Sequence, residues 1–562
     1  MDNKKYSRKK FISFLGKVTL GVTVIPPFLT SCGNTSTPIK LGELSNIQLE
    51  RLKTLSLEGL TSTDEDDLVL TKGLDYYTII KWNDKISNKD TFGFNCDFTC
   101  FIPLDPKNPN DGLLWVNHEY INTLFVSGYN YRDPKQSRTK QQVDKEMYNV
   151  GGSIVRIRKE NGKWEIVHND PHNRRITAKT PIKFNWDKPI KGKTTAIGTL
   201  ANCSGGITPW NTFLTCEENY DGFYGDIEYD ENNNPTKIPS YGYGWDNFYD
   251  YPPEHYGWVV EIDPKLGMAK KHIALGRFAH ECCTLFQLND NRVVAYTADD
   301  KNDEHLYKFV SSKPNSLKEG TLYVADLQNG KWLALDWKNQ AKLKSKFKDQ
   351  TEVLIRAREA SKLLGATELN RPEDIEIDPI TGDIFVSLTN NKPKGDYHGS
   401  ILKIEEKNGA FDSLTFHAST YIAGGEESGF SCPDNLAFDF SGNLWLTSDM
   451  SGSSMNKIDS PYMPFKNNSL FVIPRHGNEA GKVIRVASAP RDAELTGPWF
   501  APDGKSLFLS VQHPGEQTTH LNNPTSKWPF DEDNIPKPSV VAITGDLIEK
   551  MNNLNKIEGS SC

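Results

Sequence analysis

Three stretches in the second half of the chain decide its fold: IEIDPITGDIFVSL (375–388), LAFDFSGNLWLTSD (436–449) and WFAPDGKSLFLSVQ (499–512). Each consists of two apolar runs joined by a turn that contains a glycine, which is the pattern of a β-hairpin. The three turn glycines lie at intervals of 60 and 62 residues, and weaker copies of the pattern turn near Gly112, Asn211 and Asn291. Repeats of this length are typical of propellers and solenoids. The sequence therefore predicts an all-β fold, one closed array of six such hairpin repeats of the β-propeller type, with inserted helices and loops.

In each hairpin the two strand ends furthest from the turn lie at the same edge. Stacking the hairpins around one axis gathers these ends in one place. They carry acids, amides, His, Arg or Cys in almost every copy. The residues are 95–97 with His118 and Glu119; Asn202 and Cys203 with Glu217 and Glu218; His280 and Glu281 with Asp299 and Asp300; Arg371, Glu373 and Asp374 with Asn390; Asp434 and Asn435 with Asp449; and Trp499 with His513. We expect a metal site assembled by repetition.

Three further segments have a predicted place in this fold. A strand at 539–544 would close the ring beside an N-terminal strand at 76–81, which removes exposed sheet edges. Apolar residues at helical spacing predict one inserted helix within 345–366. A stretch at 219–256 that is rich in Tyr, Gly, Asp and Asn is expected to be a long loop over the site.

The composition narrows the classes of function. The chain has 562 residues, of which 37% are hydrophobic and 25% are charged, enough for a sizeable core. Its net charge of −8 argues against a nucleic-acid partner, because phosphate backbones need basic patches. A GxSxG nucleophile motif and an HExxH zinc motif are both missing from the sequence. Clustered acids suit hard cations instead.

The N-terminus has the features of an export signal. A basic stretch precedes an apolar run at 11–29, and Leu29-Thr30-Ser31-Cys32 resembles a bacterial lipobox. We expect a signal peptide over 1–32, a flexible tether over 33–64 and a single catalytic propeller over 65–562. The protein would then be extracytoplasmic, in the periplasm or at the cell surface, and anchored to the membrane through a lipid on Cys32. A plain signal peptide with a chance Cys remains an alternative. SRKKFI (7–12) resembles a twin-arginine signal with Lys in place of the second Arg, so the export route stays open.

Eight cysteines remain after Cys32 is set aside, and their pairing cannot be read from the sequence. Exported proteins usually pair their thiols, and Cys96 with Cys100 or Cys282 with Cys283 are close in sequence. Neither spacing fits a zinc or redox motif. Most of these side chains are expected to be buried small hydrophobes.

Cys203 is the single residue that most strongly suggests a metal ligand. It stands in NCSGG (202–206), where polar and flexible neighbours make a poor core position. As a thiolate it would favour a transition metal over Ca²⁺; the alternative is a buried free thiol. TCEEN (215–219) follows the same hairpin. Because strand side chains alternate between faces, either Glu217 or Glu218 must point inward.

The remaining candidate residues indicate chemistry on a phosphate group. Arg371 in RPED (371–374) is a planar fork that can grip phosphate oxygens, although it could also form an ion pair that fixes its loop. Further acids stand at the hairpin ends, and each alone could be structural; they are Asp97, Glu119, Glu281, Glu373 and Asp434. A thiolate, many carboxylates and an Arg at one end of a propeller axis together indicate metal-assisted phosphoryl hydrolysis.

Eight segments in order resemble the PhoX family of exported bacterial alkaline phosphatases. They are NCD, VNHE, NCSGGITPWNTFLTCEEN, GRFAHE, RPEDIEIDP, LTNN, SCPDNLAFD and TGPWFAPDG. The resemblance implies a six-bladed propeller that binds iron and calcium ions bridged by an oxo group and acts on phosphate monoesters. It makes Cys203 an iron ligand, places Glu281 and Glu373 in the metal cluster, and gives Glu217 or Glu218 to calcium. Glu119, Asp97 and Asp434 are further candidate metal ligands. Arg371 would hold the substrate phosphate, and Arg371 and Glu373 are the predicted catalytic residues.

The sequence thus predicts a metal-dependent phosphatase with Fe³⁺ and Ca²⁺ that releases phosphate from small-molecule phosphate esters. It would be a monomer without a nucleic-acid partner. Two alternatives stay open: a calcium-dependent lactonase or phosphodiesterase on the same fold, and a non-enzymatic propeller that binds a surface partner. A transition metal would favour the phosphatase, because a single calcium site needs neither the Cys nor so many acids.

Overall fold

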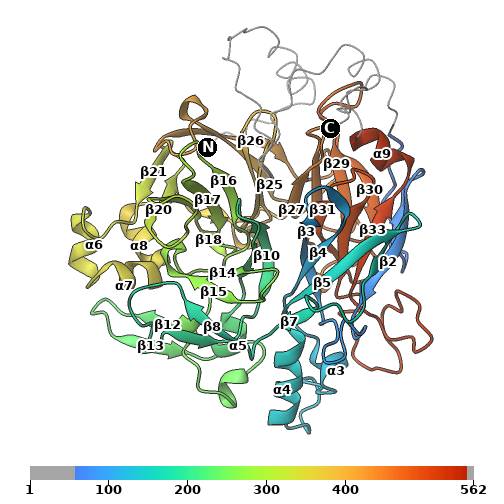
Figure 1. The fold of residues 1–562 in the computed structure, drawn as a ribbon, viewed down its shortest axis with the longest axis horizontal. Helices are drawn as coiled ribbons and strands as arrows, with labels where there is room; N and C mark the ends of the chain where they lie inside the picture. Colours follow the sequence, from blue (N-terminus) through green and yellow to red (C-terminus); the bar gives the residue numbers. More distant parts are fainter. Residues whose placement is uncertain (1–56, 553–562) are drawn as a thin grey trace.

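The computed structural model describes residues 57–552, and these form six antiparallel or mixed sheets arranged as the blades of a propeller (Figure 1). Blade 1 contains β3 (Cys96–Asp105), β4 (Asn108–His118), β5 (Gly151–Glu160) and β6 (Lys163–Ile166), with β7 (Arg174–Ile176) beside β5. Blade 2 contains β10 (Asn202–Ile207), β11 (Phe213–Glu217), β14 (Val259–Ile262), β15 (Ala269–His272), β8 (Pro181–Phe184) and β9 (Thr195–Ile197). Blade 3 contains β16 (Thr284–Gln287), β17 (Val293–Ala298), β19 (Leu306–Ser311), β20 (Gly320–Asp326) and β21 (Lys331–Ala334).

The other three blades come from the second half of the chain and the N-terminal strands. Blade 4 contains β23 (Pro372–Ile377), β24 (Ile384–Leu388), β25 (Ser400–Glu406) and β26 (Phe416–Ala423). Blade 5 contains β27 (Pro433–Phe438), β28 (Leu444–Ser448), β29 (Ser469–Ile473), β30 (Ile484–Ser488) and β1 (Val69–Leu70). Blade 6 contains β31 (Glu494–Phe500), β32 (Leu507–Gln512), β33 (Ser539–Thr544) and β2 (Asp75–Lys81). The six-bladed all-β fold is as predicted.

The ring closes through the N-terminal strands. β2 pairs antiparallel with β33, with Tyr76 opposite Ile543, and Figure 1 shows the blue β2 beside the red β33. This closure was predicted from the sequence. β1 adds a second N-terminal strand to blade 5, with Val69 opposite Ser488. Two blades therefore depend on the first strands of the chain.

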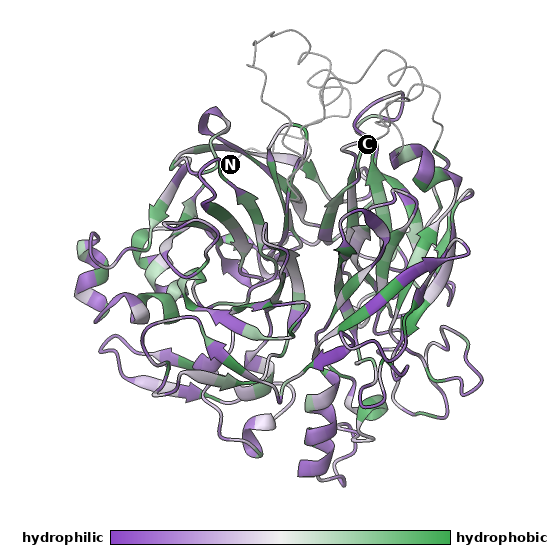
Figure 2. Cartoon of the chain, viewed as in Figure 1, coloured by the Kyte–Doolittle hydropathy of each residue, from purple (hydrophilic) through white to green (hydrophobic). Residues whose placement is uncertain are grey.

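Six hydrophobic clusters fill the spaces between neighbouring blades, one for each pair of neighbours in the described chain. Successive residues of a strand face opposite blades. Leu113 and Trp115 pack toward blade 2, whereas Leu114 and Val116 pack toward blade 6. In Figure 2 the hydrophobic green is concentrated in the strands, while α4 (Lys140–Asn149) and α6 (Ala341–Lys346) are mostly hydrophilic.

The same alternation explains the cysteines. All seven in the described residues are free, and six of them are buried. Cys282 belongs to the cluster between blades 3 and 4 and Cys283 to the cluster between blades 2 and 3, so the two thiols point apart. Cys96 and Cys100 also lie in different clusters. Most of these cysteines are buried small side chains in the core, as expected.

Five of the six predicted turn residues have the left-handed backbone that such turns need. Gly382, Gly442 and Gly504 have φ of 76°, 78° and 66°, and Asn211 and Asn291 have φ of 60° and 64°. The turn near Gly112 was wrong. Gly112 lies inside β4 opposite Pro103, and the turn precedes it, between β3 and β4.

The inserted segments are more structured than predicted. The one helix expected within 345–366 is the end of α6 followed by α7 (Gln350–Ile355) and α8 (Ala357–Leu364). α7 and α8 are separated at Arg356, whose φ of −110° and ψ of 42° are not helical. The expected loop at 219–256 contains α5 (Asp221–Tyr224) and the hairpin of β12 (Asp226–Tyr229) and β13 (Pro235–Ile238).

Smaller elements complete the described chain. They are α3 (Thr123–Val126), α9 (Asp546–Asn552), the strand pair β18 (Asn302–Glu304) and β22 (Leu369–Asn370), and short 3-10 turns at Trp245–Asn247, Pro253–His255, Ile273–Leu275, Lys392–Lys394 and Lys407–Gly409. No described helix has the length and apolar character needed to cross a bilayer.

The N-terminal predictions fall mostly outside the described residues. The segment predicted to be a signal peptide with a lipobox, 1–32, and the predicted tether up to residue 56 lie outside the described residues. Residues 57–64, the last part of the expected tether, lie along blade 5, where the Leu60 N–H donates to the Arg485 carbonyl at 2.9 Å.

Candidate metal centre

A one-residue bulge marks the same end of every inner strand. In blade 1, Cys96 and Thr99 stand three positions apart, whereas their partners His118 and Val116 stand two apart. The same excess of one residue begins after Asn202, His280, Pro372, Pro433 and Thr496 in the other blades. Bulges of this kind re-aim side chains and are common beside active sites.

Each bulge begins at one residue, and the residue that directly follows it belongs to an inner ring around the propeller axis. In chain order these six are Asp97, Cys203, Glu281, Glu373, Asp434 and Gly497. Five of them can ligate a metal. Blade 6 supplies a glycine, since a Cβ at Gly497 would lie 2.6 Å from the Phe98 Cα and its φ is +54°. The inner strands that carry these residues, among them β3, β10, β27 and β31, lie near the middle of the molecule (Figure 1).

A second ring comes from the ends of the next strands. Within two residues of the ends of β4, β11, β17, β24, β28 and β32 stand Glu119, Glu218, Asp300, Asn390, Asp449 and His513. Four of these six are carboxylates. The end of the propeller axis therefore holds far more acid than the described cations around it can neutralise.

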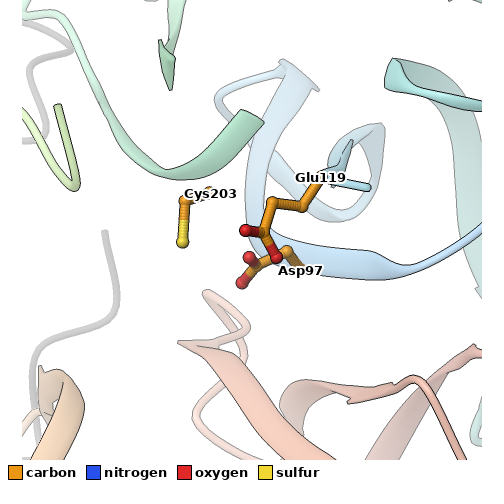
Figure 3. Close-up of side chains that lie close together, drawn as sticks. All are labelled: Asp97, Glu119 and Cys203. Carbon is orange, nitrogen blue, oxygen red and sulfur yellow. The ribbon is translucent and has the colours of Figure 1, made fainter. Parts of the chain in front are cut away.

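Seven of these residues form three overlapping groups whose ligand atoms lie within 4.8 Å of one another. The groups are Asp97, Glu119 and Cys203; Cys203, Glu218 and Glu281; and Glu281, Glu373 and Asp434. We call these seven residues the acid cluster. Figure 3 shows Cys203 from blade 2 converging with Asp97 and Glu119 from blade 1. Cys203 and Glu281 are shared members, so the cluster could hold several ions side by side.

Burial makes this cluster costly without cations. The Oδ1 of Asp97, the Oε1 of Glu218 and the Oε2 of Glu281 are buried and accept no hydrogen bond from the described residues. Burial raises the pKa of Asp97 to about 7. Burial and the nearby Asp97 raise the pKa of Glu119 to about 8. Burial and mutual repulsion also raise the pKa values of Glu218, Glu281, Glu373 and Asp434.

The donor set fits metal ions. Buried carboxylates are normally paired or bound to a metal, and the orphaned oxygens of the cluster are acceptors with nothing to accept. Carboxylate oxygens suit Ca²⁺, and the Cys203 thiol adds one soft ligand suited to a transition ion. The Cys203 Sγ lies 2.9 Å from the Glu281 Oε1.

Arg371 borders the acid cluster and contacts residues of blades 3 and 4. Its Nε and Nη2 donate to the two oxygens of Asp300 at 2.9 and 2.7 Å, and Nη2 also lies 2.9 Å from the Glu373 Oε1. Its backbone is left-handed, with φ of 50°, and such strain is concentrated at functional sites. The ion pair considered from the sequence is present. The described contacts use Nε and Nη2, so Nη1 can still donate to a phosphate oxygen.

The structure brings Glu218 into the cluster but not Glu217. Glu217 accepts from the Lys271 Nζ at 2.6 Å, and both side chains are 0% exposed. It also accepts from the Trp258 N–H. Its carboxylate is used inside blade 2, which settles which of the two adjacent glutamates points toward the axis.

Sequence reasoning missed Glu494 and placed Trp499 at the axis wrongly. Trp499 lies beyond the bulge of β31 and packs between blades. Glu494 is the first residue of β31, it is buried, and its Oε2 lies 3.1 Å from the His513 Nε2. Gly497-Pro498 disguised the start of this strand, because proline normally interrupts a ladder. Counting back from the turn leads to Gly497 and not to Glu494: the inner-ring residues precede Gly382, Gly442 and Gly504 by seven to nine positions, whereas Glu494 precedes Gly504 by ten.

Asn117 fixes the bulge that presents Cys203. Its Nδ2 donates to the carbonyls of Cys203 and Ser204 at 2.6 and 2.9 Å. Its Oδ1 accepts from the Trp115 Nε1 and the Thr215 hydroxyl. A fully buried amide with all of these hydrogen bonds made is a rigid support for its neighbours.

Comparison with known proteins agrees with this geometry. The profile of the family described as alkaline phosphatase PhoX matches residues 55–515. A solved structure of Pseudomonas fluorescens PhoX in complex with vanadate, a transition state analogue, is 29% identical. The match covers 89% of this chain and 99% of that one, with a TM-score of 0.78. A Dyadobacter fermentans protein of unknown function is 9% identical over 84% of this chain and 100% of that one, with a TM-score of 0.37. No curated protein matches the chain.

Proposed function

The chain belongs to the alkaline phosphatase PhoX family, and on that basis we propose that its acid cluster holds both Fe³⁺ and Ca²⁺. The protein is an alkaline phosphatase, a metal-dependent enzyme that hydrolyses phosphate monoesters. The observation that supports the proposal most directly is the chain of three overlapping ligand groups, two of which share the Cys203 thiol. A single ion would need only one of these groups.

We assign Cys203 to iron together with Glu281, because a thiolate beside a carboxylate suits a transition ion. Asp97, Glu119, Glu218, Glu373 and Asp434 would complete the iron and calcium sites. When bound, the ions would neutralise the charge of the phosphate ester and supply or hold the attacking oxygen.

Arg371 would bind the substrate phosphate. Its guanidinium is held in one orientation by the two contacts to Asp300, and a planar donor that is already oriented stabilises developing charge effectively. Glu373 holds the same guanidinium at 2.9 Å while belonging to the acid cluster. The two predicted catalytic residues thus link substrate binding to metal binding. The relative from Pseudomonas fluorescens binds vanadate, a transition state analogue, and we expect the same of this chain.

The setting of the enzyme is also part of the proposal. The signal-like N-terminus with Cys32 in a lipobox supports an extracytoplasmic protein anchored to the membrane by a lipid. Its substrates would be small phosphate esters outside the cytoplasm, and the enzyme would act as a monomer to scavenge phosphate.

Elemental analysis beside a phosphatase assay tests the metal assignment. The purified protein is measured for iron and calcium, and hydrolysis of p-nitrophenyl phosphate is followed with and without a chelator. We expect both metals and turnover that the chelator abolishes. Cys203→Ala should lose iron and activity together, whereas Cys216→Ala, which removes a buried thiol of the same blade, should keep both. Calcium without iron, or full activity of Cys203→Ala, would refute the assignment.

A further inference from the structure

Lys301 stands at the rim of the acid cluster without a place in the chemistry described so far. It follows Asp300, the residue that holds Arg371. Its Nζ donates to the Asn219 Oδ1 at 2.7 Å, and the Asn219 Nδ2 donates in turn to the Glu218 Oε2 at 2.5 Å. A chain of two contacts therefore fixes the ammonium beside a member of the cluster.

The ammonium remains available to a ligand. Its side chain is 31% exposed, and its nearest described carboxylate, Asp221, lies 3.9 Å away, beyond hydrogen-bonding distance. An ammonium has three N–H donors, and the described contacts use one of them for a short hydrogen bond. Two donors can therefore reach a molecule bound at the mouth of the site.

Space for that molecule lies on the same side. Asp221 and Tyr241 border Lys301, and both also line a cleft of about 430 Å³ between the insertion at 219–256 and helix α8. Tyr241 is 68% exposed, and its ring centre lies 6.0 Å from the Lys301 Nζ. A phosphate held by Arg371 would leave the organic part of the ester to extend toward this rim.

We infer that Lys301 is a substrate-binding residue that recognises a second anionic group, such as a carboxylate, on the organic part of a phosphate monoester. Two cations stand near Asp300: Arg371 pairs with its carboxylate, and Lys301, the next residue in the chain, has its ammonium 3.9 Å from the Asp221 carboxylate that lines the cleft. A substrate with two anionic groups could engage both. The inference rests on the proposed phosphate-binding role of Arg371 and adds a preference among monoesters.

A matched pair of substrates tests this. 3-Phosphoglycerate carries a carboxylate where glycerol 3-phosphate carries a neutral hydroxymethyl group. We expect Lys301→Met to lower the ratio of kcat/KM for 3-phosphoglycerate over glycerol 3-phosphate by about tenfold, which corresponds to one hydrogen bond between charged groups. Lys301→Arg keeps the charge and should keep most of the ratio. Lys505→Met serves as the control, because Lys505 lies in the turn of blade 6 at the end away from the acid cluster. This variant should keep the whole ratio.

The outcomes separate this inference from the proposal beneath it. If the wild-type protein hydrolyses neither ester, the proposed function fails. If it hydrolyses both and Lys301→Met leaves their ratio unchanged, or if Lys301→Arg lowers the ratio as much as Lys301→Met does, then recognition of a second anion by Lys301 is wrong. Equal losses for both esters would also overturn it, because they would indicate a general effect on the centre.

Discussion

At the scale of single residues, Glu217 and Glu218 show how adjacent carboxylates acquire different tasks. Glu217 is paired with Lys271 inside blade 2, and both are fully buried. Removing one partner of a buried ion pair leaves an uncompensated charge and costs about 3–5 kcal/mol. We therefore expect Glu217→Gln to lower the melting temperature clearly while the folded fraction keeps its metals.

Glu218→Gln should have the opposite pattern. Glu218 belongs to the acid cluster, so its loss should reduce the bound metal and the activity. The metal-free protein should not be destabilised, because one buried charge is removed. Thermal unfolding and elemental analysis of both variants test this difference. Loss of metal from Glu217→Gln at full stability would contradict the structural role of Glu217.

Arg371 carries the second prediction at this scale. Its Nε and Nη2 contact Asp300 as a planar pair, a geometry that Lys cannot reproduce. We expect Arg371→Ala to keep the metals and lower kcat/KM about 100-fold, the usual effect of losing one oriented donor to the transition state. Asp300→Asn should cause a smaller loss, since the guanidinium is still present but less firmly held. Steady-state kinetics beside metal analysis provide the check, and wild-type kinetics for Arg371→Ala would remove Arg371 from the mechanism.

Much of the candidate site could be predicted from the residue types and their repeat. All seven members of the acid cluster were among the predicted ligands, because acids, amides, His, Arg or Cys recur at the hairpin ends in almost every copy. The direction of each side chain could not be predicted. It depends on the bulges, which invert the alternation of a strand, and a strand pattern of period two contains no sign of them. Glu494 was missed for a separate reason, because Gly497-Pro498 concealed the start of its strand.

At the scale of elements, the closing strands give a prediction about truncation. β2 completes blade 6 beside β33, and its Ile80 is fully buried between blades 6 and 1. Removing residues 1–81 would expose the β33 edge and this apolar surface, and exposed edges promote aggregation. We expect that variant to be insoluble or to melt at a much lower temperature.

A shorter truncation is its control. The described contacts with the propeller begin near residue 57, so removing residues 1–56 should leave the melting temperature and the metal content as they are. Soluble expression and thermal unfolding of the two variants are to be compared. Native melting after removal of 1–81 would mean that the ring does not depend on its N-terminal closure.

The elements themselves were predicted unevenly. Hairpins with left-handed turn residues were clear, since few residues adopt that backbone and glycine and asparagine mark it. The insertions were not. Arg356 separates α7 from α8 within the predicted helix through its backbone angles, and nothing in its helix-favouring residue type indicates the break. The hairpin of β12 and β13 was hidden in a stretch whose polar composition is typical of loops.

At the scale of the whole molecule, six blades are packed around a cluster of buried acids, and the bound ions should act as a central clamp. Ligands that bind only the folded state stabilise it by mass action. Removing the metals should therefore lower the melting temperature of the whole propeller, because no blade can move away from the repulsion without opening two of the interblade cores.

The metal-free protein should also respond to pH in an unusual direction. The folded-state pKa is about 7 for Asp97 and about 8 for Glu119, both raised by burial, whereas unfolded carboxyls titrate near 4. Between these values the folded state binds more protons than the unfolded state, so the free energy of unfolding falls as pH rises. We expect chelator-treated protein to lose stability from about pH 4 to pH 8. The metal-loaded protein should instead gain stability as the carboxylates are freed to bind metal. Thermal unfolding of both forms across this range gives the test. Parallel curves would show that the acid cluster is not what the metals stabilise.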